Sequence, residues 1–250
     1  MKKYLTLIVI IITSIQSFAL KVELSNDTFS TTGRGSNRNL FVTNNSEKMA
    51  ALEVYSQSRV IDSVTGLDQL DDVEEFLIFP SQLLLQPNEQ QVVTLTWVGP
   101  QSIESEQAFR IVVEELNLSL GDDGEDLGDG QTSVKLAALA KVVKAAYVSP
   151  SNAKPNVKIV NTAVVDDPNI SKKMLEITFE NNGTKHKIMK QTSITIVPVG
   201  ADGNPVTQQQ QAYMPEQLNG VLNILAKSQR VVRVSLPEGM DGYSEIKASL

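Results

Sequence analysis

The stretch that decides the fold reads QAFRIVVEELNLSL at 107–120, GDDGEDLGDG at 121–130 and QTSVKLAALAKVVKAAYVSP at 131–150. Between Ala108 and Leu116 the side chains alternate in the period-two pattern of a half-buried strand. The last run is strand-like over about fifteen residues, whereas strands usually have five or six. We therefore predict two strands around a loop, and we expect the second strand to cross a whole domain or to offer its edge to another chain.

The loop at 121–130 is acidic and rich in glycine, and its composition permits two interpretations. Its carboxylates could bind calcium, but the loop lacks the spacing and the twelfth-position Glu of an EF-hand. Its charge and its near-lack of apolar residues favour a disordered loop instead. We predict no metal site here.

The absence of Cys and the presence of a single His exclude most site chemistry. Thiolate metal sites and cysteine nucleophiles are impossible, and the fold must be held by core burial instead of disulfides. The one His, His186, lies in the polar run ENNGTKHKIMK, so we interpret it as a solvated loop or edge residue. No Rossmann glycine pattern, P-loop or nucleophile elbow occurs. We expect neither an enzyme nor a cofactor.

Residues 1–19 have the pattern of a secretory signal peptide. Lys2 and Lys3 form its positive region, Leu5–Ile12 its apolar region, and Ser17–Ala19 a small-x-small cleavage site. The apolar run is about ten residues, half of the roughly 20 that cross a bilayer. We expect an exported chain without stable membrane insertion after cleavage. The net charge of −7 also disfavours binding to nucleic acid or to anionic membranes.

From Leu20 onward, short strand patterns alternate with turns, which predicts an all-β protein. Residues 39–43 and 49–57 predict a hairpin around Asn44-Asn45-Ser46, with Leu52 and Val54 facing inward. Residues 62–75 fit a loop, a short helix or a ragged edge strand equally well.

Two prolines, Pro150 and Pro155, interrupt the strand pattern and divide the chain into two halves. We therefore predict two β-sandwich domains, with one large β domain as the alternative. The predicted boundaries are a signal peptide at 1–19, an N-terminal domain at 20–148, a linker at 149–156 and a C-terminal domain at 157–250.

Three segments, by their order and spacing, resemble the periplasmic chaperones of the chaperone–usher pathway, which assemble pili. The segments are LFVTNNSEKMAALEVYSQS at 40–58, FLIFPSQLLLQPNEQQVVTLTW at 76–97, and the strand pair EQAFRIVVEEL…VKAAYVSP at 106–150. The resemblance implies two immunoglobulin-like domains in an L-shaped arrangement and a periplasmic location. It also implies pilus or fimbrial subunits and an outer-membrane usher as partners.

The resemblance further implies that the long second strand is lent to a subunit whose own sandwich lacks a strand. Alternation alone favours the face of Val134 and Leu136 as the inserted or core face. Matching Tyr147 to the family's Tyr instead turns Ala137, Leu139 and Val143 toward the subunit's groove. A bulge could reconcile the two registers, and we expect Leu139 to be a groove residue.

In the family, basic side chains in the cleft between the domains bind the C-terminal carboxylate of the subunit. Lys144 matches the family's strand-end Lys, whereas Asn26 stands where the classical Arg is found. Arg110 resembles the Arg that divergent branches carry on the preceding strand. The resemblance therefore implies that Arg110 and Lys144 converge on one carboxylate through charge-assisted hydrogen bonds. The alternative function is a secreted structural or adhesive protein of two immunoglobulin-like domains, in which both cations are solvated.

Overall fold

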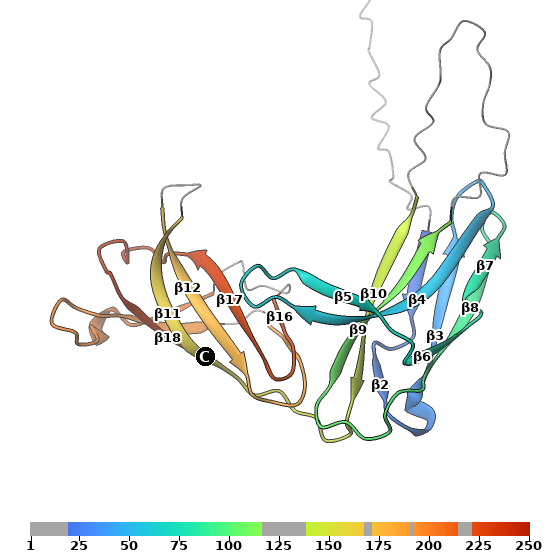
Figure 1. Cartoon of the computed structure of the whole chain (residues 1–250). Coiled ribbons are helices and arrows are strands. Elements are labelled where there is room, and N and C mark those ends of the chain that lie inside the picture. Colours follow the sequence, from blue (N-terminus) through green and yellow to red (C-terminus); the bar gives the residue numbers. More distant parts are fainter. Residues whose placement is uncertain (1–19, 117–138, 168–171, 191–192, 215–221) are drawn as a thin grey trace, which may run out of the picture.

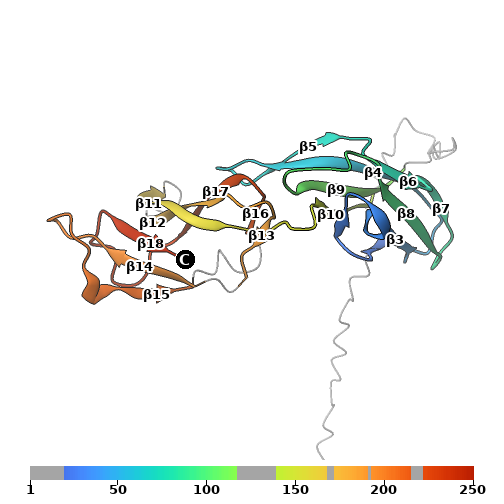
Figure 2. The same ribbon diagram turned by 90° about the horizontal axis from the view of Figure 1, so that it is seen from below.

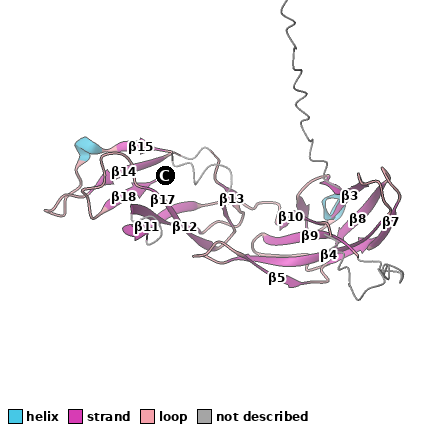
Figure 3. Cartoon of the chain, turned by 90° about the horizontal axis from the view of Figure 1, so that it is seen from above, coloured by secondary structure: helices cyan, strands magenta, loops and turns pink. Residues whose placement is uncertain are grey.

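The computed structural model describes residues 20–116, 139–167, 172–190, 193–214 and 222–250. The regular elements of these residues are strands, apart from two short 3-10 helices, η1 (Gly33–Ser36) and η2 (Thr207–Gln209), so the predicted all-β class is confirmed (Figure 3). The predicted signal peptide and the acidic loop lie outside the described residues. Within the described ranges, no helix has the length and apolar character needed to cross a membrane.

The N-terminal half forms two facing sheets. The first contains, in order, β1 (Leu20–Leu24), β3 (Asn37–Asn44), β8 (Gln90–Trp97) and β6 (Phe76–Phe79). The second contains, in order, β2 (Thr28–Ser30), β10 (Lys141–Ser149), β9 (Gln107–Glu115), β4 (Ala50–Ile61) and β5 (Asp68–Asp72), with β7 (Gln82–Leu85) also paired to β4. The predicted pairing of the two runs around the acidic loop is thus present as β9 and β10, which are antiparallel.

The alternating apolar side chains of both sheets bury one core between them. The Phe76 ring lies near its centre, edge-on to the rings of Phe29, Trp97 and Phe109, with centroid distances of 5.1, 5.3 and 5.2 Å. Edge-to-face contacts of this kind add to the free energy of apolar burial. Leu52 and Val54 of β4 face inward as predicted.

The predicted hairpin of 39–43 with 49–57 is wrong. β3 pairs with β1 and β8, whereas β4 lies in the opposite sheet. The cause is Asn44, whose buried side-chain amide lies 2.7, 3.1 and 3.2 Å from the carbonyl oxygens of Lys48, Leu85 and Gln86. These bonds hold a corner that carries the chain across the sandwich. The undecided segment 62–75 contains an edge strand, β5, whose one partner among the described strands is β4.

The C-terminal half has a separate core, which includes the fully buried Leu175, Ile177 and Phe179. One of its sheets contains β11 (Val157–Asp167), β12 (Lys172–Asn181) and β17 (Ser228–Ser235). Another contains β15 (Gln211–Tyr213), β14 (Ile194–Pro198) and β18 (Ile246–Ser249), and β13 (Lys187–Ile188) pairs with β16 (Asn223–Ile224).

Asn181 forms a corner like that of Asn44, because its side-chain amide lies 2.7, 3.2 and 3.0 Å from the carbonyl oxygens of Lys185, Ile224 and Leu225. In both corners the first of these carbonyls is four residues after the Asn. The corner of each sandwich therefore depends on one buried Asn.

The two sandwiches meet at an angle, and the segment between β10 and β11 joins them (Figures 1 and 2). The turn after β4 reaches β17, where the Val231 amide donates to the Ser63 carbonyl at 2.7 Å. Ile61, Tyr147 and Leu225 form a small apolar cluster across the junction.

Candidate functional site

The sheet that contains β9 and β10 carries Ile61 and Tyr147 on its outward face, and these residues contact Leu225 of the C-terminal sandwich. On β9, Phe109 and Ile111 enter the core, so Arg110 between them points outward. The register places Arg110 opposite Gln57 of β4 and Ala145 of β10. A cleft of about 400 Å³ lies beside this face and is lined by residues of both sandwiches.

Arg110 contacts a carboxylate of its own chain. Its Nε and Nη2 donate to Oδ2 of Asp68 at 3.0 and 2.5 Å, and the Nε of Arg59 donates to Oδ1 at 2.9 Å. The Arg59, Asp68 and Arg110 side chains are 9%, 24% and 20% exposed, and we call these three residues the Asp68 cluster. Burial raises the pKa of Asp68, but the hydrogen bonds from Arg110 and Arg59 outweigh this effect and lower the pKa below its usual value.

A third guanidinium, that of Arg230 on β17, approaches from the C-terminal sandwich. Its Nη1 donates to the Asp62 carbonyl at 2.7 Å, while its Nε is buried without a hydrogen-bond partner among the described residues. Burial lowers the pKa of Arg230, and the positive charge of Arg59 lowers it further. Positive charge thus gathers at the Asp68 cluster.

Lys144 lies on the other face of the sheet. It stands opposite Ile111 in the pairing of β10 with β9, whereas Arg110 stands opposite Ala145. The Lys144 residue is half-buried at the edge of the sandwich. The structure therefore does not bring Arg110 and Lys144 together on one face. Lys144 is the neighbour in sequence of Ala145, which pairs with Arg110.

Among the described strands, none pairs with one edge of β10 over most of its length. β10 pairs with β9 from Lys141 to Val148 but with β2 only from Tyr147 to Ser149. The Tyr147 amide donates to the Asp27 carbonyl at 2.7 Å, so by alternation the backbone groups of Lys141, Val143 and Ala145 point to the same side, where no described strand pairs with them. An unpaired edge of this kind is a template for another strand.

The side chains near this edge divide into two sets. Ala140 and Val142 pack against the N-terminal core, whereas Leu139 and Val143 are 46% and 42% exposed. Leu139 and Val143 thus lie exposed, and their entry into a subunit's groove stays a prediction. The other predicted donor residues, Val134, Leu136 and Ala137, lie outside the described residues.

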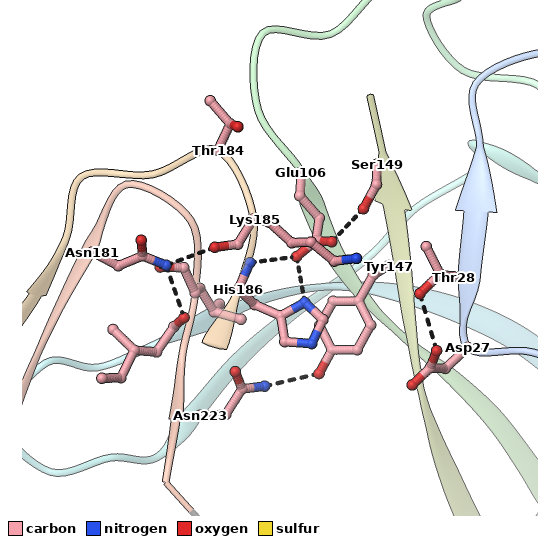
Figure 4. Close-up of polar contacts among 12 residues, drawn as sticks. Asp27, Thr28, Glu106, Tyr147, Ser149, Asn181, Thr184, Lys185, His186 and Asn223 are labelled. Atoms are coloured by element: carbon pink, nitrogen blue, oxygen red, sulfur yellow. Dashed lines mark hydrogen bonds and ion pairs between the residues drawn. The ribbon is translucent and has the colours of Figure 1, made fainter. Parts of the chain in front are cut away.

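The two sandwiches are also joined by a hydrogen-bonded contact that the sequence does not indicate (Figure 4). The backbone amide and the ring Nδ1 of His186 lie 2.8 and 2.5 Å from Oε1 of Glu106. Both donate, because an ionised carboxylate only accepts. Ser149 Oγ donates to the other oxygen of Glu106, and Asn223 donates to the Tyr147 hydroxyl at 2.8 Å.

The interpretation of His186 as a solvated residue is wrong, because its side chain is only 12% exposed. Glu106 and Tyr147, the residues that bury His186, belong to the other sandwich, so the composition of the segment around His186 cannot reveal its burial. Burial raises the pKa of Glu106, but the hydrogen bonds from His186 and Ser149 outweigh this effect and lower the pKa. The contact therefore holds an ionised carboxylate at the junction of the sandwiches.

The sequence matches no known family model, and no curated protein matches it. Solved structures do match. The YadV chaperone aligns with a TM-score of 0.52 at 12% identity, covering 92% of this chain and 91% of the other. This is the fold of the pilus chaperones.

Two further solved structures also align with nearly the whole chain. The class 5 fimbriae chaperone CfaA aligns with a TM-score of 0.50 at 14% identity, over 92% of this chain and 99% of the other. The chaperone–tip adhesion subunit pre-assembly complex CsuC–CsuE of Acinetobacter baumannii contains a chain that aligns with a TM-score of 0.52 at 12% identity, over 91% of this chain and 92% of the other. The fold expected from the sequence resemblance, two immunoglobulin-like sandwiches, is confirmed.

Proposed function

We propose that this protein is a periplasmic chaperone that binds incomplete pilus or fimbrial subunits and delivers them to an outer-membrane usher. The observation that carries the proposal is the open edge of β10, with Leu139 and Val143 exposed beside it. This edge occurs in a chain with the fold of the pilus chaperones.

The physical basis is the addition of a strand to a sheet edge. The backbone groups of Lys141, Val143 and Ala145 can pair with an extended segment of the subunit, whatever the side chains are. Leu139 and Val143, which are exposed on the same side of the chain with Lys141 between them, then fill the groove that the subunit's missing strand leaves open. Both contacts cover surfaces of the subunit that would otherwise aggregate.

Arg110 and Lys144 are the proposed contacts of the subunit's C-terminal carboxylate. Arg110 already binds a carboxylate, that of Asp68, at hydrogen-bonding distance. Lys144 lies on the opposite face of the sheet from Arg110. At Lys144, however, β10 is the edge strand, because β2 pairs with it only from Tyr147 onward. The long lysine side chain can therefore pass around this edge to the face of Arg110. We also propose that an outer-membrane usher is a second partner, that residues 1–19 are a signal peptide, and that residues 149–156 link the two domains.

The test is coexpression of the full chain with a subunit from the same pilus gene cluster. We expect the subunit to be soluble only with the chaperone, and to co-purify with it. Arg110→Ala should abolish co-purification while leaving the chaperone folded. Arg233→Ala is the matched control, because Arg233 is an exposed arginine paired with Glu176 in the C-terminal sandwich. A chain that never retains a subunit would favour the alternative, a secreted structural or adhesive protein.

A further inference from the structure

The Asp68 cluster has the form of an anion site that the protein fills with its own side chain. We propose that Arg59 and Arg110 form a carboxylate-binding site, that Asp68 occupies it in the free protein, and that the C-terminal carboxylate of a subunit displaces Asp68. The identity of the displacing group rests on the proposed function. The site itself rests on the geometry of the cluster.

The donors engage both oxygens of the carboxylate separately. Arg59 Nε lies 2.9 Å from Oδ1 of Asp68, and Arg110 Nε and Nη2 lie 3.0 and 2.5 Å from Oδ2. Arginines select carboxylates because their planar N–H groups match the geometry of the two oxygens. Any carboxylate at the position of Asp68 would find the same donors.

The two arginines and Asp68 lie on strands that differ in length and in position within the sheet. Arg59 and Arg110 belong to β4 and β9, which are long and pair with each other within the sheet. Asp68 begins β5, a five-residue strand at the edge, in which each of the other four residues is exposed. Exposed edge strands open at lower free energy than central ones. The arginines are therefore fixed, and Asp68 is the member that can withdraw.

Charge also favours an exchangeable anion. The Arg59 side chain is 91% buried, as its 9% exposure implies, and a guanidinium this buried needs a negative partner. Arg230 adds positive charge from the C-terminal sandwich, and its buried Nε has no hydrogen-bond partner among the described residues. Arg59 also lines the cleft between the sandwiches, so an incoming group can reach the cluster from that side.

An internal occupant makes the site selective. A tethered carboxylate competes at a high effective concentration, so free small carboxylates are excluded. A subunit gains strand pairing along β10 at the same time as its terminus reaches Arg110, and this added contact lets it displace Asp68. Arg59 and Asp68 are then residues that determine binding specificity, in addition to Arg110.

The first experiment tests the site without a subunit. Thermal unfolding of the full-length mature chain is followed at pH 7 in sodium acetate, in sodium chloride of equal ionic strength, and in acetamide, the neutral isostere of acetate. We expect Asp68→Ala to lower Tm in chloride and acetate to restore much of that loss in a dose-dependent way, while acetamide does not. The wild type and Asp72→Ala should not respond to acetate, because Asp72 lies on the same strand but bonds Gln57 and no arginine.

An Asp68→Ala protein that responds equally to acetate and to chloride would overturn the proposal. If this variant does not fold, Asp68→Asn replaces it, and it should show the same preference for acetate over acetamide. Adding Arg59→Gln to either variant should remove the acetate response. A response that survives Arg59→Gln would also overturn the assignment.

The second experiment links the site to the subunit. Affinity for a subunit is compared between wild type and Asp68→Ala, with the subunit's C-terminus either free or amidated by semisynthesis. We expect Asp68→Ala to bind the free terminus several-fold more tightly and to gain nothing for the amide. Equal gains for both termini would contradict displacement of Asp68. If no variant binds a subunit while acetate still rescues Asp68→Ala, the proposed function fails and the carboxylate site stands.

Discussion

His186 of the C-terminal sandwich stacks on Tyr147 of the N-terminal sandwich, with ring centroids 3.9 Å apart and planes 16° apart. The same imidazole holds Glu106, and Tyr147 also bonds Asn223. Tyr147 lies on β10, so the strand proposed to bind the subunit also takes part in the contact between the sandwiches. Glu106 of the same contact lines the cleft between them.

Loss of the His186 side chain should loosen the junction. His186→Ala removes the stack and one hydrogen bond to a buried carboxylate, which should cost about 1–3 kcal/mol of unfolding free energy. His186→Phe is the control, because it keeps the stack and removes only the bond to Glu106. Small-angle scattering should show a broader distribution of interdomain distances for His186→Ala. Identical scattering and stability for the wild type and both variants would contradict this role.

The junction should also weaken in acid. The pKa of Glu106 is lowered in the folded protein, so its contribution to stability is fully present above its unfolded pKa of about 4.3 and is lost as the pH falls through the folded value. Asp68 adds the same dependence below about 3.9. Urea midpoints measured from pH 6 to pH 3 should therefore fall in the acid range, and less steeply for Glu106→Gln. An unchanged slope in Glu106→Gln would show that other groups cause the loss.

Loss of the buried Asn side chain should lower the unfolding free energy by a similar amount in the two corners. Asn44→Ala and Asn181→Ala each leave buried carbonyl oxygens without their donor, so each should cost about 1–3 kcal/mol. Asn45→Ala and Asn182→Ala are matched controls, since these neighbours are exposed. Urea unfolding followed separately in each sandwich should assign the loss to the sandwich that carries the change. A control as damaging as its buried neighbour would refute the corner account.

The register of β10 has its own test. Val142 packs against the core, so Val142→Ala should lower the stability of the free protein by roughly 1–2 kcal/mol. Leu139→Ala should leave Tm nearly unchanged and weaken subunit binding, because Leu139 is 46% exposed. A strong loss of Tm in Leu139→Ala, with normal Tm in Val142→Ala, would mean that the register is shifted by one residue.

Much of the fold follows from local patterns. The alternation around Arg110 and the turn residues predict most strands of the N-terminal sandwich, because one face of each strand is buried. The hairpin at Asn44 was predicted wrongly because an Asn-rich turn looks the same whether the chain returns along one sheet or crosses to the other. The decisive bonds of Asn44 go to carbonyls of Leu85 and Gln86, about forty residues away in sequence.

The site was less predictable for a related reason. Family resemblance indicated Arg110, but Asp68 is one of several acids between Asp62 and Glu75, and no spacing distinguishes it from the others. Its role comes from the pairing of β5 with β4, which brings it within reach of Arg59 and Arg110. His186 was missed because both its partners lie in the other sandwich.

Hydrogen exchange along β10 tests the central claim most directly. In the free protein, the amides of Val143 and Ala145 point to the open edge and should exchange fast, whereas those of Val142 and Lys144 point toward β9 and serve as internal controls. When a subunit is bound, we predict that the Val143 and Ala145 amides become protected by at least tenfold, about 1.4 kcal/mol, with little change in the controls. A stable complex in which both edge amides still exchange as fast as in the free chain would contradict strand donation by β10.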